Sequence, residues 1–259
     1  MTTTFANDTE EILVLYGSQT GNSESAAEQI HAAIPTKLPT TSSKDGKCCT
    51  TTARLMHLDD FLELECGKWT RLIIIVCSSY GVGQAPLGAR KFREFCDEIL
   101  KRHRDGEGEN DDTKVIPSLR GVNFALLGLG DSHYSTYFKN PTTIHEALLV
   151  MGAKRAGEIG KADAGGTGHM EQSKVIERWI DNIWAELDNV VMSKPSVNTT
   201  DLDQARKETW DFCLEIFPDW KKQHSSAAKE VKKKNYYLAI NIMVGILLAL
   251  IARYTAMRL

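Results

Sequence analysis

Four short apolar runs, each ending in turn residues, constrain the fold more than any other feature of this sequence. They are residues 11–17, 52–58, 71–79 and 122–130. Segments of helix length separate or follow them, near residues 23–33, 88–102, 142–151 and 171–187. Nearly continuous apolar strands that alternate with helices are typical of a parallel sheet covered on both faces. With a fifth strand near residues 153–159, the sequence predicts a five-stranded, doubly wound α/β fold.

In a doubly wound fold, ligands bind beyond the carboxyl ends of the strands, where the strand order reverses. The stretch "SQTGNS" follows the first predicted strand and leads into a helix. Backbone amides at a helix start carry partial positive charge, so amides and hydroxyls can hold a phosphate without a lysine. The stretch matches neither the GK[ST] triphosphate loop nor the GxGxxG turn. The alternative is a hydroxyl-rich turn with an ordinary helix cap. The predicted phosphate residues are Ser18, Gln19, Thr20, Gly21, Asn22 and Ser23.

Two further loops combine tyrosines with glycines. "SSYGVGQAP", residues 78–86, follows the third strand and contains Tyr80. "GLGDSHYSTYF", residues 128–138, follows the fourth strand and contains Tyr134 and Tyr137. Glycines let the backbone approach a flat ligand closely. A planar ring that carries a phosphorylated side chain fits between such loops, and flavin mononucleotide (FMN) has this form. The alternative for any one of these tyrosines is packing on the rim.

Long segments of the sequence resemble the flavodoxin-like domain of the diflavin reductases, the NADPH-haemoprotein reductase and methionine synthase reductase type. The resemblance covers about residues 10–190, in order. It is carried by "LYGSQTGNSESAA", "SSYGVGQAPLGARKF", "LLGLGDSHYSTYF" and "GKADAGGTGHMEQSKVIERWIDNIW". It implies that residues 18–23 hold the phosphate of FMN, that Tyr80 and Tyr134 flank the isoalloxazine, and that Gly81 adjusts to the reduced ring. The other residues that it places at the cofactor are Ser78, Ser79, Leu129, Gly130, Asp131 and Asp163. Ser132 and Tyr137, on the loop after the fourth strand, complete the predicted cofactor site.

The sequence departs from the family pattern in three places. Val82 and Gln84 occupy positions where the family usually has acids, and Asp131 stands where many members have asparagine. The first two departures bear on the charge of the partner-docking surface and on the flavin potential. An acidic body without a nearby cation makes a negative, reduced flavin costly, so we expect a ready one-electron donor. His133, beside the ring-binding loop, either tunes proton uptake at the flavin or is a solvated loop residue.

Charge is distributed unevenly along the chain. The net charge is −3, but residues 221–259 carry six lysines and two arginines against the single acid Glu230, so residues 1–220 carry −10. An acidic body argues against nucleic acid as a partner and suits a basic partner protein. The six cysteines form no CxxC pair, which argues against zinc and iron-sulfur sites and favours a reducing compartment. Cys48 and Cys49 are either a redox pair or an exposed loop pair.

Residues 236–252, "YYLAINIMVGILLALIA", form an uncharged run between three lysines and Arg253. As a helix these 17 residues would span about 25 Å, slightly less than the apolar core of a bilayer at about 30 Å. We expect a tail anchor, with the body on the cytosolic face of the endoplasmic reticulum or the mitochondrial outer membrane. The alternative is a buried helix of the domain. The polar amino terminus lacks a secretory signal.

The resulting domain plan has four parts: a polar segment (1–9), the flavodoxin-like domain (10–190), a linker (191–234) and the anchor (235–259). The polar stretches 35–51 and 103–114 are predicted surface insertions. In the linker, residues 201–220 form an amphipathic helix that docks a partner or packs on its own domain.

Without the FAD- and NADPH-binding half of the reductases, we expect a membrane-anchored electron carrier. A separate FAD/NADPH reductase would donate its electrons, and a haem, iron-sulfur or desaturase-type protein would accept them singly. One alternative is a flavin-free anchored scaffold. The other is a quinone reductase that uses NAD(P)H directly.

Overall fold

The structure is a computed structural model that describes residues 8–38, 41–42, 48–106, 116–193 and 199–220. The chain divides into two units, residues 1–216 and 217–259. In the second unit the description covers residues 217–220, where the rings of Phe217 and Trp220 stack with their centroids 4.5 Å apart. The fold and the candidate site described below belong to the first unit.

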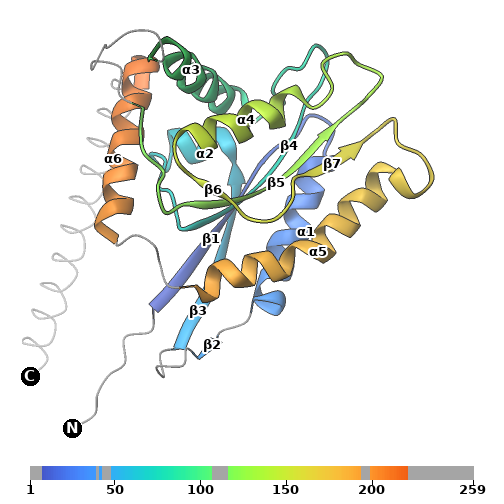
Figure 1. Cartoon of the computed structure of the whole chain (residues 1–259), viewed down its shortest axis with the longest axis horizontal. Helices are drawn as coiled ribbons and strands as arrows, with labels where there is room; N and C mark the ends of the chain where they lie inside the picture. The colour runs from blue at the N-terminus through green and yellow to red at the C-terminus, as the bar shows by residue number, and fades with distance from the viewer. Residues whose placement is uncertain (1–7, 39–40, 43–47, 107–115, 194–198, 221–259) are drawn as a thin grey trace, which may run out of the picture. The chain divides into compact units, whose positions relative to one another are not determined.

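A parallel sheet forms the centre of the first unit (Figure 1). Its strands lie in the order β2 (Thr41–Ser42), β3 (Cys48–His57), β1 (Asp8–Gly17), β4 (Leu72–Ser78), β5 (Asn123–Gly130) and β6 (Lys154–Arg155), and β7 (Gly160–Asp163) also pairs with β5. All pairings are parallel except that of β2 with β3. The chain adds β3 on one side of β1 and β4 on the other, so the strand order reverses beside β1. The predicted doubly wound α/β fold is confirmed.

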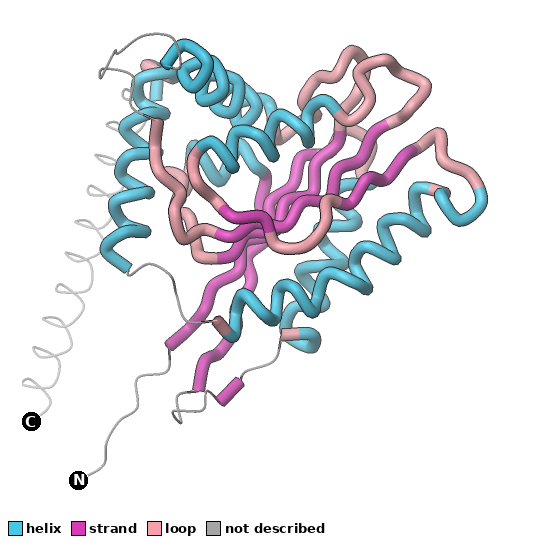
Figure 2. Tube along the Cα trace, viewed as in Figure 1, coloured by secondary structure: helices cyan, strands magenta, loops and turns pink. Residues whose placement is uncertain are grey.

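Helices cover both faces of the sheet (Figures 1 and 2). One face carries α1 (Asn22–Lys37) and α5 (Gln172–Met192), and the other carries α2 (Leu58–Glu63), α3 (Arg90–Gly106) and α4 (Lys139–Val150). Residues 72–77 of β4 are all fully buried, because side chains that point to either face meet a helix layer. This two-sided burial explains why the strands are nearly continuous apolar runs in the sequence.

The prediction that residues 35–51 form a surface insertion was wrong at both ends. Helix α1 continues to Lys37, and β3 begins at Cys48, four residues before the predicted strand. The short antiparallel strand β2 lies between them. Thr and Cys are compatible with an extended strand but give no hydrophobic signal near the edge of a sheet. Cys48 and Cys49 therefore belong to a strand rather than to a loop.

The predicted fifth strand at residues 153–159 is also corrected, and so is the count of five strands. Two short strands replace it, β6 and β7, and both pair with β5. β6 pairs near the start of β5, at Asn123 and Phe124, whereas β7 pairs with its second half. Gly157 separates them with a φ of 68°, a left-handed conformation that interrupts a strand. Helix α3 continues to Gly106, so residues 103–106 are helical and do not belong to the predicted insertion at 103–114. Residues 107–115 lie outside the described part of the chain.

The predicted amphipathic helix of the linker packs on its own domain. It forms α6 (Thr199–Ile216), and its Phe212 ring lies 5.5 Å from that of Phe95 on α3. The indole Nε1 of Trp69 donates a hydrogen bond of 3.0 Å to the hydroxyl of Thr209. The buried residues of α6 are Ala205, Thr209, Phe212 and Cys213.

The predicted anchor, residues 236–252, lies outside the described residues. Across the ranges that are described, no helix combines the length and the apolar character that crossing a bilayer requires.

Candidate functional site

Three loops gather at the carboxyl edge of the sheet, as the sequence predicts (Figure 2). The first loop (residues 18–21) joins β1 to α1, the second (79–89) joins β4 to α3, and the third (131–138) joins β5 to α4. The amide of Ser18 donates to the carbonyl of Leu87 at 3.2 Å, so the first loop is tied to the second. The amide of Ser79 donates to the carbonyl of Leu129 at 2.9 Å, which ties the second loop to β5.

The first loop presents the start of α1 without a side-chain cap. Gly21 is the N-cap residue, with φ of 91°, and its amide donates to the hydroxyl oxygen of Ser18 at 3.0 Å. The first helical hydrogen bond of α1 runs from Ser25 to Gly21, which leaves the amides of residues 22–24 without a carbonyl partner inside the helix. Free amides at the positive end of a helix dipole form an anion site.

Ser23 supplies the test of whether this loop fits a phosphate. Its side chain is 1 % exposed, and its hydroxyl oxygen has no hydrogen-bond partner in the described part of the chain. A buried hydroxyl without a partner is costly, and a phosphate oxygen beside the helix start is an acceptor that would satisfy it. Gln19 and Thr20 are exposed on the same loop. The residues therefore fit the phosphate of FMN.

A buried asparagine fixes the start of the second loop. Asn140, on α4, is fully buried and donates from its side-chain amide to the carbonyl of Ser78 at 2.9 Å. Its backbone amide donates to the hydroxyl oxygen of Ser79 at 2.7 Å. The hydroxyl oxygen of Ser79 therefore accepts from the start of α4. Tyr80 and Gly81 follow directly, half-buried and exposed, respectively.

The two tyrosines of the third loop lie differently. Tyr134 is 54 % exposed, which leaves its ring available to a ligand. Tyr137 is half-buried: a side chain on Gly130 would meet its ring atoms at 2.9 and 3.0 Å, and its ring lies 5.7 Å from that of Phe138. Burial, with a contribution from Asp163, raises the pKa of Tyr137. Tyr137 therefore packs over the end of β5, and Leu129 and Gly130, both buried, present backbone at the edge.

The two acids predicted at the site, Asp131 and Asp163, both accept hydrogen bonds from backbone amides near the sheet edge. Asp163 accepts hydrogen bonds of 2.9 Å from the amides of Ser132 and Gly165. Burial raises the pKa of Asp163, but hydrogen bonds from Ser132 and Gly165 outweigh it and hold the pKa below its usual value. The amide and imidazole of His133 lower the pKa of Asp131. His133 is exposed, and its Nδ1 lies 2.7 Å from that carboxylate, so Asp131 and Asp163 shape the third loop.

Sequence reasoning missed four residues that support the loops. Asn140 and Gln172 bond to the edge of the sheet: Gln172 donates to the carbonyls of Gly130 and Ala162 and accepts from Asn22 at 3.0 Å. The others are Arg93 and Thr136, which bond to the second loop. Arg93 also corrects the expectation that no cation lies near the loops. No local motif marks these positions, because each acts across at least ten residues of sequence.

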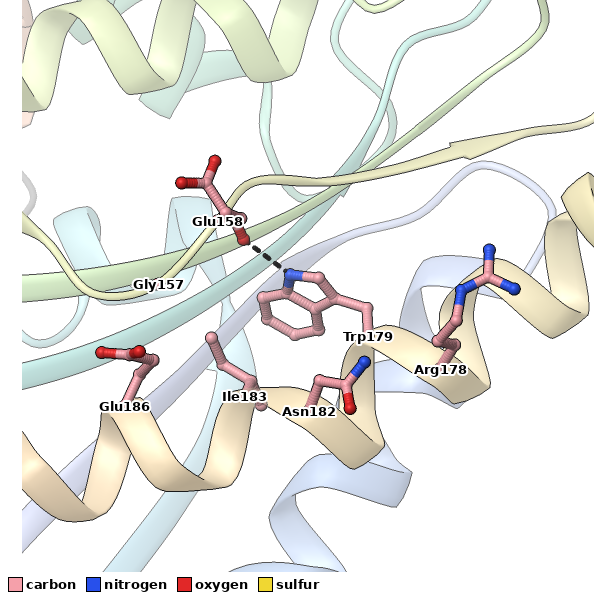
Figure 3. A pocket seen from close by; sticks show the side chains of 7 residues that line it. All are labelled: Gly157, Glu158, Arg178, Trp179, Asn182, Ile183 and Glu186. Atoms are coloured by element: carbon pink, nitrogen blue, oxygen red, sulfur yellow. Dashed lines mark hydrogen bonds between the residues drawn. The ribbon is translucent and has the colours of Figure 1, made fainter.

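A cavity of about 560 Å³ lies elsewhere, between α5 and the segment that joins β6 to β7 (Figure 3). There the indole Nε1 of Trp179 donates to the carbonyl of Glu158 at 2.8 Å. Gly157 and Glu158 precede β7, so this cavity lies toward the amino end of that strand, whereas the three loops follow carboxyl ends. None of the predicted cofactor residues lines it, and we assign it no part in cofactor binding.

Comparison with known proteins identifies relatives of the domain. A bifunctional cytochrome P450/NADPH–P450 reductase of Bacillus cereus is 30 % identical over 182 residues, which are 69 % of this chain and 14 % of that protein. Methionine synthase reductase of Caenorhabditis elegans is 29 % identical over 177 residues, 68 % of this chain and 22 % of that protein. The chain thus spans less than a quarter of the length of these two relatives. A solved structure of oxidised flavodoxin 1 from Bacillus cereus is 19 % identical with a TM-score of 0.46, and the match covers 70 % of this chain and 98 % of that one.

Residues 14–179 match the family model for flavodoxin, which covers more than half of the chain. Flavodoxins and the homologous domains of diflavin reductases bind FMN. The described domain is accordingly an FMN-binding electron-transfer domain with homology to the diflavin reductases. By fold, loops and family match, this chain belongs to the flavodoxin family.

Proposed function

We propose that the chain is a membrane-anchored electron carrier that holds FMN at the carboxyl edge of its sheet. It takes electrons from a separate FAD/NADPH reductase and passes them one at a time to a haem, iron-sulfur or related acceptor. The observation that carries this proposal is the convergence of an uncapped helix start and two tyrosine-bearing loops at one edge. The two relatives described above are reductases by name, which supports electron transfer as the activity.

The proposed roles follow from the placement of each group. The amides and hydroxyls of residues 18–23 hold the phosphate, and Tyr80 and Tyr134 contact the ring. The backbone of residues 78–81 and 129–132 borders the ring, and Asp163 and Tyr137 shape the third loop. FMN supplies both one-electron and two-electron chemistry when it is bound. The protein needs no general base of its own, because its task is to bind the cofactor, orient it and tune its potential.

The donor is proposed to be a second protein. Hydride transfer from NADPH requires a nicotinamide site beside a flavin, whereas the family match at residues 14–179 is to flavodoxin. An NADPH-dependent partner would therefore deliver electrons through its own FAD.

The carboxyl-terminal run at residues 236–252 is proposed to anchor the carrier to an intracellular membrane, with the domain on the cytosolic face. Its support is the uncharged sequence between basic flanks. Tethering raises the effective concentration of an acceptor in the same membrane. We expect the full chain in the membrane fraction after alkaline extraction and a chain lacking residues 221–259 in the soluble fraction. Equal partitioning of the two chains would contradict the anchor.

A donor experiment tests the proposed direction of electron flow. The full chain, loaded with FMN under anaerobic conditions, is mixed with NADPH, first alone and then with a catalytic amount of an FAD-containing NADPH reductase. We expect the flavin absorbance to remain with NADPH alone and to bleach when the reductase is added. Rapid bleaching by NADPH alone would contradict the carrier and favour a quinone reductase that uses NADPH directly.

A further inference from the structure

The turn of the second loop, Tyr80–Gln84, is closed by its own backbone. The amide of Tyr80 donates to the carbonyl of Gln84 at 3.2 Å, and the amide of Gln84 donates back to the carbonyl of Tyr80 at 2.9 Å. Gly81 and Gly83 both have positive φ, 53° and 83°. Left-handed glycines rotate their peptide groups at little steric cost. The direction of the peptide carbonyls inside this turn therefore depends on groups outside it.

Two side chains from different elements bond to those carbonyls. The hydroxyl of Thr136, on the third loop, donates to the carbonyl of Gly81 at 3.2 Å. The guanidinium of Arg93, on α3, donates from Nη1 to the carbonyl of Gly83 at 3.3 Å. Each bond commits a carbonyl lone pair and gives that peptide group a preferred direction. The turn is thus restrained by the protein on two sides.

Arg93 is itself held in place. Its Nε lies 3.0 Å from both carboxylate oxygens of Asp97, and its Nη1 also donates to the side-chain oxygen of Asn140 at 3.3 Å. The Arg93 side chain is 14 % exposed, and Asn140 is fully buried and bonded to the carbonyl of Ser78. A guanidinium with several partners loses little freedom for each further bond that it makes. Arg93 therefore provides a rigid attachment for the turn.

Resting on the proposed function, we propose that Thr136 and Arg93 are positioning residues that set the potential of the bound flavin by holding the carbonyls of this turn. A flavin ring nitrogen accepts hydrogen bonds when oxidised and bears a hydrogen when reduced. If the carbonyl of Gly81 is free to turn toward that nitrogen, it stabilises the reduced form, whereas its bond to Thr136 opposes this. Arg93 acts on the same turn by holding the carbonyl of Gly83. The two bonds thus lower the potential at which the first electron enters.

Thr136→Val and Thr136→Ser form the central pair of variants. Valine keeps the shape and removes the hydroxyl, whereas serine keeps the hydroxyl. The full chain is purified in detergent, and the potentials of both one-electron steps are measured by anaerobic titration together with the FMN dissociation constant. We expect Thr136→Val to favour entry of the first electron by about tenfold, which is a rise of about 59 mV for one electron. In Thr136→Ser, the equilibrium constant for entry of the first electron should stay within about twofold of wild type.

Arg93→Lys extends the test without removing a charge. Lysine cannot reproduce the geometry of a guanidinium that bonds Asp97, Asn140 and the carbonyl of Gly83 together. The first potential should therefore rise although the positive charge remains. The control is Arg90→Met, which removes an exposed positive charge from the same helix. Arg90 bonds Asp59 through its backbone amide, which the substitution keeps. This control should therefore leave the equilibrium constant of each one-electron step within about twofold of wild type.

Hydrogen exchange of the cofactor-free protein gives a readout that does not depend on the flavin. Peptides that cover residues 80–84 should exchange several-fold faster in Thr136→Val than in wild type and Thr136→Ser. Unchanged potentials and unchanged exchange in both Thr136→Val and Arg93→Lys would overturn the inference. Failure of the wild-type chain to bind FMN would instead contradict the proposed function, and the exchange result would still decide whether the turn is held.

Discussion

Thr20→Asp is expected to weaken FMN binding by at least about 100-fold, or about 2.7 kcal/mol, without weakening the fold. Thr20 is exposed on the first loop, just before α1, where the phosphate is proposed to bind. A carboxylate there repels the phosphate dianion. The same carboxylate interacts favourably with the positive end of the helix dipole, so the fold should be unchanged or stabilised by about 0.3–1 kcal/mol.

The matched control is Thr20→Asn, which has nearly the shape of aspartate without its charge. We expect its FMN dissociation constant to remain within about fivefold of wild type. Affinity is measured by quenching of FMN fluorescence, and stability by urea unfolding of the cofactor-free protein. Equal affinities for the two variants would show that the phosphate binds elsewhere.

Trp69→Ala is expected to destabilise the domain by about 3–5 kcal/mol, because it removes a large, fully buried side chain. The Trp69 ring packs edge-on against Phe61 at 4.7 Å and lies 6.4 Å from Phe92. The Trp69 carbonyl also accepts from Arg206 on α6 at 3.0 Å. Trp69 thereby connects α2, α3 and α6, and we expect α6 to detach in this variant. Denaturant unfolding, followed by circular dichroism, measures the loss.

Trp69→Phe separates packing from hydrogen bonding. It keeps an aromatic ring but leaves the hydroxyl of Thr209 without the indole donor, which should cost about 1–3 kcal/mol. Trp69 precedes β4, at the end of the strand opposite the cofactor loops. FMN affinity of the folded Trp69→Phe protein should therefore stay within about twofold of wild type. A loss below about 1 kcal/mol in Trp69→Ala would contradict the assigned role.

The architecture could be predicted from the sequence because the strands at its centre are buried on both faces. Residues 72–77 admit only apolar side chains, and the turn residues after each strand mark its carboxyl end. The sequence alone therefore assigns the three loops to one edge of the sheet. The short strands toward the edges of the sheet were harder to predict from the sequence. β2, β6 and β7 are two to four residues long, and β3 begins with polar Thr and Cys, so neither periodicity nor apolar content marks them.

The supporting contacts of the site could not be predicted in the same way. Asn140 reaches Ser78 across 62 residues, and Asn22 meets Gln172 across 150. Such pairs depend on how helices pack over the sheet, which local sequence does not encode. The orientation of a side chain within a correctly assigned loop was equally out of reach. The ring of Tyr137 packs over Gly130, whereas the ring of Tyr134 is exposed.

The rim of the site differs from the acidic pattern that the resemblance implies. Val82 is 73 % exposed and Gln84 is also exposed, so acids at these positions would face solvent. The rim acids Asp131 and Asp163 are engaged with His133 and with loop amides. The exposed rim therefore lacks the acids that the resemblance implies at positions 82 and 84.

The most direct test of the central claim is the visible spectrum of the full chain purified in detergent, followed by identification of the cofactor that is released on heating. The account predicts flavin absorbance bands and the release of FMN rather than FAD, at about one molecule per chain. A colourless protein that also takes up no added FMN would contradict the electron carrier and leave an anchored, flavin-free scaffold as the better description.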